Sequence, residues 1–237
     1  MEHATYQARR GEIETYFDRT AVKAWEHLTS DAPVGRIRAT VRAGRDRMRA
    51  TLLSWLPADM HGMRLLDAGC GTGALAVEAA SRGAHVVAID LSPTLVELAV
   101  RRVAQHLETF DNAGHIDFRS GDMLDAGLGH FDHVVAMDSL IHYEAHDVVR
   151  ALEAWAPRVS RSMLITFAPR TPALAAMHAV GRFFPRGDRA PSIEPVAETA
   201  LKRGLLAAPG LQAFCDARTE RVASGFYTSQ ALEIARS

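Results

Sequence analysis

The sequence predicts an α/β protein built around a mostly parallel β-sheet. Short apolar runs typical of buried strands alternate with stretches of helical periodicity from residue 64 to residue 167. A glycine-rich turn joins the first of these strands to the first of these helices. Two strand-like segments joined by a tight turn end the sequence, which predicts an antiparallel strand at the edge. Strands that alternate with helices in this order form a sheet with helices on both faces.

The first 57 residues are expected to form a helical cap or arm over this core. Apolar residues recur at helical spacing from Ile13 to Leu28, and residues 31–33 interrupt the pattern. A second helix is expected over 34–56, where Pro57 ends it. One face of this helix carries a row of arginines, Arg38, Arg42, Arg45 and Arg49. A solvated basic face is the preferred interpretation, ahead of a contact with substrate or membrane.

The core is expected over residues 58–237. Strands are predicted at 64–67, 85–90, 115–119, 131–137 and 162–167, and helices at 74–81, 93–106 and 147–156. Residues 169–208 are interpreted as an insert that forms a substrate lid, because the stretch is rich in proline and follows the fifth strand. Strands over 211–222 and 225–234 then close the sheet.

Composition excludes several classes of protein. A net charge of −1 over 237 residues gives no general attraction to nucleic acid. The two cysteines are too few for a disulfide framework, and Cys215 is expected in the core. The N-terminus lacks the apolar stretch of a secretory signal, and no apolar run reaches the roughly 20 residues needed to span a bilayer. We therefore expect a cytoplasmic enzyme, with a peripheral membrane contact left open.

The glycine-rich turn predicts a nucleotide site. Gly69, Gly71 and Gly73 allow a tight turn and a close approach of the backbone to a ligand, and Asp90 follows at the end of the second strand, where it can accept ribose hydroxyls. Asp67 would repel the pyrophosphate of a dinucleotide but suits a cofactor with an ammonium and a sulfonium. The string D-x-G-x-G-x-G resembles the first motif of the class I S-adenosylmethionine-dependent methyltransferases, whose sheet is Rossmann-like.

That resemblance implies further cofactor residues. Asp122 would meet the adenine amino group, and Met123 would cover the ring. Leu91 follows Asp90 in the same cofactor set. Asp138, at the end of the fourth strand, would lie beneath the cofactor and face the substrate. S-adenosylhomocysteine would be the product of the cofactor.

A closer resemblance extends almost over the whole chain. The segments outside the glycine turn are similar to the magnesium-protoporphyrin IX O-methyltransferases of bacteriochlorophyll synthesis: YFDRTAVKAWEHL, IRATVRAGRDRMR, FDHVVAMDSLIHY, ITFAPRTP and SGFYTSQALEIAR. The resemblance implies methyl esterification of one propionate of magnesium-protoporphyrin IX. It also makes the porphyrin-binding subunit of the magnesium chelatase a candidate partner.

Two residues are candidates for the chemistry. A propionate is ionised at neutral pH, so no strong general base is required. The resemblance implies that His142 is an active-site residue, and we expect it to orient the carboxylate or remove a residual proton. Tyr16 lies on the capping helix, where its hydroxyl could pair with substrate or cofactor; packing in the core is an equal alternative.

The lid would supply the substrate contacts. Phe183 and Phe184 could cover an apolar disc, and Arg170 and Arg186 could pair with its carboxylates. The histidines show no metal-ligand spacing, so we expect no protein-bound metal and assign magnesium to the substrate.

Three other functions compete with this one. A class I methyltransferase for another acid, phenol or amine would keep the glycine turn without a wide apolar pocket. A dinucleotide-dependent oxidoreductase is disfavoured by Asp67. A non-catalytic module that binds cofactor or porphyrin is disfavoured by His142 and Tyr16.

Overall fold

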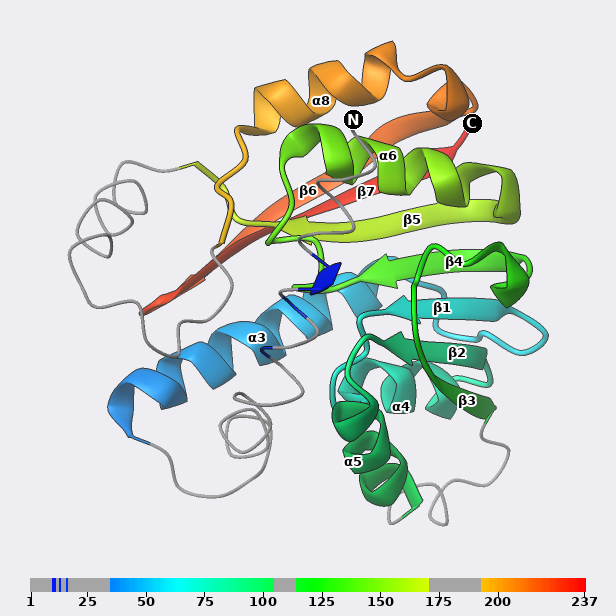
Figure 1. Cartoon of the computed structure of the whole chain (residues 1–237), viewed down its shortest axis with the longest axis vertical. Helices are drawn as coiled ribbons and strands as arrows, with labels where there is room; N and C mark the ends of the chain where they lie inside the picture. The colour runs from blue at the N-terminus through cyan, green and yellow to red at the C-terminus, as the bar shows by residue number, and fades with distance from the viewer. Residues whose placement is uncertain (1–9, 12, 14–15, 17–34, 105–113, 171–192) are drawn as a thin grey trace.

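The computed structural model describes residues 10, 11, 13, 16, 35–104, 114–170 and 193–237. Its centre is a seven-stranded sheet (Figure 1). The strands are β1 (Arg64–Ala68), β2 (His85–Asp90), β3 (His115–Ser120), β4 (Phe131–Ala136), β5 (Val159–Phe167), β6 (Phe214–Ser224) and β7 (Tyr227–Arg236). The helices are α3 (Arg36–Trp55), α4 (Ala74–Ser81), α5 (Pro93–Ala104), α6 (Ala145–Trp155) and α8 (Glu198–Ala207), with short 3₁₀ turns η3 (Ala126–Leu128), η4 (Ala156–Arg158) and η5 (Pro209–Leu211).

The strand order is β3-β2-β1-β4-β5-β7-β6. The first five strands pair in parallel, and β7 runs antiparallel to both β5 and β6. The chain order reverses between β1 and β4, which is the switch point where α/β sheets leave a crevice for a ligand. This topology confirms the predicted Rossmann-like sheet with an antiparallel C-terminal strand.

The two faces of the sheet carry separate apolar clusters. Adjacent residues of one strand point to opposite faces, so Leu65 joins one cluster and Leu66 the other. Residues of α3 and α4 complete the cluster on the Leu65 side, and residues of α6 and α8 complete the cluster on the Leu66 side. Both strand residues are fully buried, so the sheet is the rigid base on which the strand ends position side chains.

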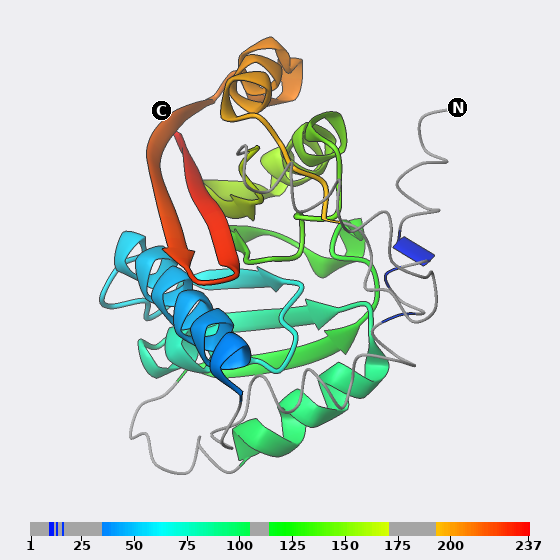
Figure 2. The same cartoon turned by 90° about the vertical axis from the view of Figure 1, so that its left-hand side faces the viewer.

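Helix α3 lies against the β6–β7 hairpin (Figure 2). Gly44 makes this possible, because a Cβ at that position would lie only 2.5–2.8 Å from atoms of the Tyr227 side chain. At the hairpin turn, a Cβ on Gly225 would collide with the side chain of Thr40. The Arg47 guanidinium also donates to the carbonyl of Ala223 at 3.5 Å. The close contacts fix the position of α3 along the hairpin.

Most predicted elements agree with the structure to within three residues at their ends. The exception is the environment of Cys215, which was predicted to be in the core and is exposed. Strand β6 is an edge strand, and most of its residues are exposed. Most of the predicted arm (1–57) before α3, and residues 171–192 of the predicted insert, lie outside the described residues. The division into arm, core and lid therefore stays a prediction.

Candidate functional site

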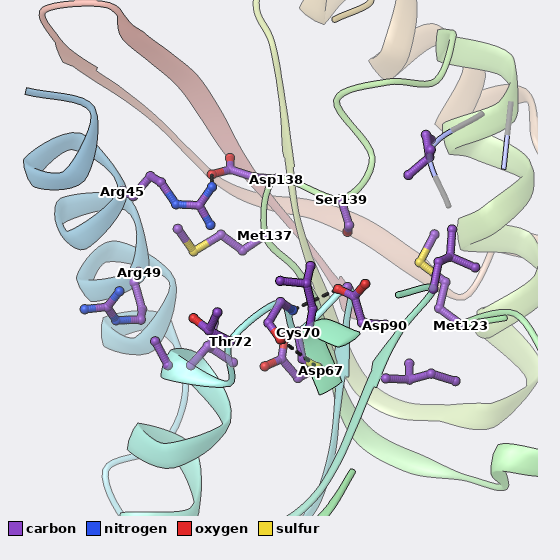
Figure 3. Close-up of a pocket in the computed structure, with 18 of the residues that line it drawn as sticks. Arg45, Arg49, Asp67, Cys70, Thr72, Asp90, Met123, Met137, Asp138 and Ser139 are labelled. Atoms are coloured by element: carbon purple, nitrogen blue, oxygen red, sulfur yellow. Dashed lines mark hydrogen bonds and ion pairs between the residues drawn. The ribbon is translucent and has the colours of Figure 1, made fainter. Parts of the chain in front are cut away.

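A cavity of about 320 Å³ opens at the switch point of the sheet. Its walls come from several separate parts of the chain (Figure 3). The turn after β1, the end of β2 and the loop after β3 form one wall, and α3 with the segment after β4 forms the other; Ile13 also lines the cavity. The lining residues used below are Ile13, Arg42, Arg45, Asp46, Arg49, Asp67, Gly69, Cys70, Gly71, Asp90, Leu91, Met123, Met137, Asp138 and His142.

The glycine turn needs glycine for two physical reasons. Gly69, Gly71 and Gly73 have φ values of 86°, 53° and 79°, in the left-handed region that glycine adopts at little cost. Space is also limited, because a Cβ on Gly69 would collide with the Ser139 side chain. A Cβ on Gly73 would lie 3.1 Å from the Phe118 ring. Gly69 and Gly71 line the cavity. Gly73 does not line it, and serves instead as the N-cap of α4.

Asp90 ties the turn to the end of β2. Its carboxylate accepts hydrogen bonds from the backbone N–H groups of Gly71 at 2.9 Å and Ser92 at 3.0 Å. A carboxylate has about four acceptor positions, so these two bonds leave capacity for ligand hydroxyls. Burial raises the pKa of Asp90, and hydrogen bonds from the backbone N–H groups of Ser92, Gly71 and Leu91 oppose that shift. Its position fits the predicted role at the ribose.

Asp67 is a buried acid at the end of β1. Burial, together with the negative charge of Asp90, raises its pKa to about 7, although a hydrogen bond from the N–H of Ala76 opposes both effects. Its Oδ2 atom is buried and has no hydrogen-bond partner among the residues that the structure describes. A cationic group in the cavity would satisfy this atom and stabilise the charged carboxylate. The ammonium of a methionine moiety has that chemistry, whereas a pyrophosphate does not.

Three further predicted cofactor residues divide into two groups. Leu91 and Met123 line the cavity and present apolar surface to it. Asp122 does not line it; its Oδ2 accepts from Arg10 Nη1 at 3.1 Å and its Oδ1 from the N–H of Leu124 at 2.9 Å. Asp122 therefore joins the described N-terminal residues to the loop after β3, and its direct contact with adenine stays a prediction.

Asp138 lies at the edge of the cavity and is held by several neighbours. It is the one non-glycine residue with a positive φ, 56°, in the part of the chain that the structure describes. Its N–H donates to Thr166 Oγ1 at 2.7 Å, and the Tyr227 hydroxyl donates to its carboxylate at 3.1 Å. Arg45 Nη1 forms an ion pair with Asp138 Oδ2 at 3.3 Å. Its described contacts connect α3 with the strand ends, a role that the sequence did not reveal.

The two candidates for chemistry have different positions. His142 is 7% exposed and lines the cavity in the turn after β4. Tyr16 is half-buried and is not among the lining residues, although Ile13 on the same N-terminal segment is. The structure therefore brings His142 to the cavity and leaves the role of Tyr16 a prediction.

The arginine row on α3 differs from the preferred interpretation. Arg42, Arg45 and Arg49 line the cavity, so a solvated basic face is wrong for these three residues. Arg38 is exposed as expected. The sequence showed the spacing of the arginines but not which side of α3 the β6–β7 hairpin covers. The contact between α3 and the hairpin decides which way the arginines face.

The predicted lid residues contribute little to the described cavity. Arg170 is exposed and is not a lining residue. Phe183, Phe184 and Arg186 lie outside the described residues. Within the described ranges no group of three or more histidine, cysteine, aspartate or glutamate side chains is arranged to hold a metal ion. In the same ranges, no helix combines the length and apolar character needed to cross a membrane.

Comparisons with known proteins identify the family. A curated magnesium-protoporphyrin O-methyltransferase of Rhodobacter capsulatus is 46% identical over 229 residues, which span 96% of this chain and 97% of the relative. The chain belongs to the magnesium-protoporphyrin O-methyltransferase family. Residues 136–236 match the model of the magnesium-protoporphyrin IX methyltransferase C-terminus, and residues 65–161 match a general methyltransferase domain.

Solved structures agree with this family. The crystal structure of magnesium protoporphyrin IX methyltransferase from Synechocystis PCC 6803 with bound SAH has a TM-score of 0.81 at 28% identity, covering 96% of this chain and 99% of that one. The structure of the same enzyme with bound SAM has a TM-score of 0.78 at 26% identity, with 97% of each chain covered. The Synechocystis enzyme thus binds SAM and SAH on the same fold as the one described here.

Proposed function

We propose that the protein transfers the methyl group of S-adenosylmethionine to a propionate carboxylate of magnesium-protoporphyrin IX, giving a monomethyl ester in (bacterio)chlorophyll synthesis. The observation that carries the proposal is the likeness to the Rhodobacter capsulatus enzyme over almost the whole chain. The cavity supports it, because the unpartnered acid Asp67 and the glycine turn suit a cationic amino-acid cofactor. When bound, the cofactor supplies an activated methyl group.

The residues of the chain act by alignment and by excluding water. Gly69 and Gly71 let the backbone approach the cofactor, Asp90 accepts from its ribose, and Asp67 balances its ammonium. His142 faces the same cavity and is nearly buried, so it can hold the substrate carboxylate in line by a hydrogen bond. Because the propionate is already ionised at neutral pH, His142 is not an obligatory base.

The reaction can be tested directly. The purified protein is incubated with S-adenosylmethionine and magnesium-protoporphyrin IX, and the products are separated by chromatography and weighed by mass spectrometry. A single methyl ester is expected. Intact cofactor binding without ester would favour a methyltransferase for another small acid, phenol or amine.

Two substitutions test the proposed roles in chemistry. His142→Ala is expected to lower kcat by about 100-fold or more while the cofactor Kd changes less than about threefold. A large loss of cofactor affinity would contradict this role. Tyr16→Phe removes only a hydroxyl, and full activity would exclude that hydroxyl from the mechanism.

The substrate cover is part of the same proposal. Phe183, Phe184, Arg170 and Arg186 would form the lid over the macrocycle, on sequence grounds alone. The proposal also includes delivery of the porphyrin by the porphyrin-binding subunit of the magnesium chelatase. It predicts faster turnover with the loaded subunit than with the same concentration of free porphyrin.

We also propose a cytoplasmic protein with a peripheral contact to an anionic membrane. Phe226 is 61% exposed at the hairpin turn, and Arg47 is exposed on the neighbouring helix α3. An exposed aromatic beside a basic group suits a lipid interface. Phe226→Ser should lower flotation with anionic vesicles, whereas Leu206→Ser, which alters a residue 89% exposed on α8, should not. Equal effects of the two changes would argue against this surface.

A further inference from the structure

Arg45 occupies a different electrostatic setting from its neighbour on α3. Arg49 is paired with two carboxylates, Asp46 at 3.0 Å and Glu78 at 2.6 Å. Arg45 Nη1 meets Asp138 Oδ2 at the longer distance of 3.3 Å, and its side chain is 20% exposed on the cavity wall. Figure 3 shows Arg45 directed from α3 toward Asp138, above Met137. A guanidinium has five N–H donors and can serve several acceptors at once, and this one lies on the cavity wall, where a ligand acceptor can reach it.

The contacts behind Arg45 hold its partner in one position. Asp138 is fixed by the hydroxyl of Tyr227 and by Thr166. Burial raises the pKa of Tyr227, and the nearby charge of Asp138 raises it further, so the phenol keeps its proton and donates. Gly44 lets the Tyr227 ring pack directly on α3, one residue before Arg45. The hairpin therefore fixes both the helix that carries Arg45 and the acid that orients it.

We propose that Arg45 is an anchor for a carboxylate of the bound reactants, and that Asp138 and Tyr227 are its positioning residues. This inference rests on the proposed function, in which two carboxylates need a cation. One belongs to the methionine part of the cofactor, and the other is the propionate of the porphyrin that does not react. Both have the planar geometry that a guanidinium binds through two hydrogen bonds.

The cavity favours this assignment over a purely structural ion pair. Arg45 and Asp138 both line the cavity, and the Arg45 side chain is partly exposed there, so a bound ligand can reach the guanidinium. The opposite side of the cavity holds Asp67, whose buried Oδ2 lacks a partner among the described residues. An acid and a guanidinium on different walls suit a ligand that carries both an ammonium and a carboxylate, or two ligands that carry one each.

The experiment compares ligands that differ only in a carboxylate. For the cofactor, the pair is S-adenosylhomocysteine and its decarboxylated analogue. For the porphyrin, the pair is magnesium-protoporphyrin IX and the monomethyl ester whose non-reacting propionate is blocked. Each is measured with wild type, Arg45→Gln, Arg45→Lys and the control Arg38→Gln, which alters an exposed arginine of the same helix that does not line the cavity.

Arg45→Gln is expected to weaken binding of one carboxylate-bearing ligand by roughly 10- to 100-fold, with less than about threefold change for its matched analogue. A loss with S-adenosylhomocysteine assigns the carboxylate to the cofactor. A higher KM for the porphyrin diacid alone, with kcat retained, assigns it to the propionate. Arg45→Lys should recover part of the affinity, and Arg38→Gln should behave as wild type.

Equal losses with both members of each pair, or no loss with any ligand, would overturn the proposal. Tyr227→Phe tests the positioning role. Its effect should follow the same ligand as Arg45→Gln, and the double variant should be no weaker than Arg45→Gln alone. Additive losses would show that Tyr227 does not act through Arg45. Ester formation by the wild type tests the proposed reaction separately, so failure of the anchor leaves that result intact.

Discussion

The two walls of the cavity are built in different ways. The glycine turn and Asp90 come from one stretch of 24 residues, 67–90, and the shape of that wall is made by the backbone. The opposite wall is made by the side chains of Arg45 and Asp138. Tyr227 lies behind this wall and donates to Asp138, from which it is 89 residues away in sequence. One wall is local and rigid, and the other depends on how a hairpin packs on a helix.

The difference teaches where each wall is sensitive to change. The wall formed by the glycine turn has no free volume at Gly69, so any side chain at that position must displace the backbone or Ser139. On the wall formed by Arg45 and Asp138, removing the Tyr227 hydroxyl or adding a methyl group at Gly44 should leave the fold intact. We expect such changes to alter ligand affinity first. Substitutions on the first wall should therefore act on all ligands, and substitutions on the second wall should act selectively.

Gly69→Ala is expected to have the largest effect. The added Cβ collides with Ser139, and the φ of 86° adds backbone strain. We expect the cofactor Kd to rise more than about 100-fold and the free energy of unfolding to fall by about 2–4 kcal/mol. Calorimetric titration with S-adenosylhomocysteine and denaturant unfolding measure the two quantities.

Gly62→Ala is the matched control for that change. Gly62 has a similar φ of 73°, but a Cβ there meets nothing within 4 Å. Only the backbone strain remains, so a loss of about 1 kcal/mol without change in cofactor affinity is expected. If both variants bind cofactor equally well, close approach at Gly69 is not what shapes the site.

Asp67→Asn should change affinity and stability in opposite directions. The pKa of about 7 in the folded protein lies above the ordinary aspartate value of 3.8, so the folded state holds this proton more tightly than the unfolded chain does. Wild-type stability therefore falls as pH rises from about 4 to about 7. At pH 8 the variant should be more stable by about 1–3 kcal/mol, because it removes a buried charge.

Cofactor affinity should respond to Asp67→Asn with the opposite sign. An ionised Asp67 balances the ammonium, so wild-type affinity should increase from pH 6 to pH 8. The variant should bind about 10- to 100-fold more weakly at pH 8 and lack this pH dependence. Affinity that depends on pH in the same way in both proteins would exclude Asp67 as the titrating group.

The contrast between the walls also explains what the sequence could predict. The fold class and the cofactor turn follow from local patterns, namely strand–helix alternation, three glycines and acids at fixed spacing. Asp138 was correctly placed at the end of β4, but its contacts with Tyr227 and Arg45 were not predicted. These contacts depend on where the C-terminal hairpin packs, and no local sequence pattern specifies the position of the hairpin.

The orientation of α3 is the clearest example. The spacing of its arginines predicts one common face, and composition alone favours solvent for such a face. The contact of Gly44 with Tyr227 turns Arg42, Arg45 and Arg49 toward the cavity instead. A glycine in the middle of an otherwise helical stretch was the available signal, because the missing side chain allows another element to approach the helix closely.

Gly44→Ala tests the side-chain wall with an intermediate effect. Alanine favours the helix by about 1 kcal/mol, but the Cβ would lie 2.5–2.8 Å from Tyr227. The clash should outweigh the gain, giving a net loss of about 1 kcal/mol and a several-fold higher KM for the porphyrin. Gly35→Ala, where a Cβ meets nothing within 4 Å, should leave both quantities near wild type. Equal KM values for the two variants would show that the α3–hairpin contact does not set the wall.

The two cysteines give the smallest expected effect and compare a cavity residue with an edge-strand residue. Burial raises the pKa of the Cys70 thiol, and Cys70 lines the cavity, whereas Cys215 is exposed on β6. A thiol reagent should therefore label Cys215 first without loss of activity, and label Cys70 slowly. Bound S-adenosylhomocysteine should slow the labelling of Cys70 further and leave the labelling of Cys215 unchanged, as followed by peptide mass spectrometry. In a separate measurement, Cys215→Ser should change the free energy of unfolding by less than about 0.5 kcal/mol. Equal labelling rates with and without ligand would mean that the cofactor does not cover the turn at Cys70, and the backbone wall would then begin at Gly71.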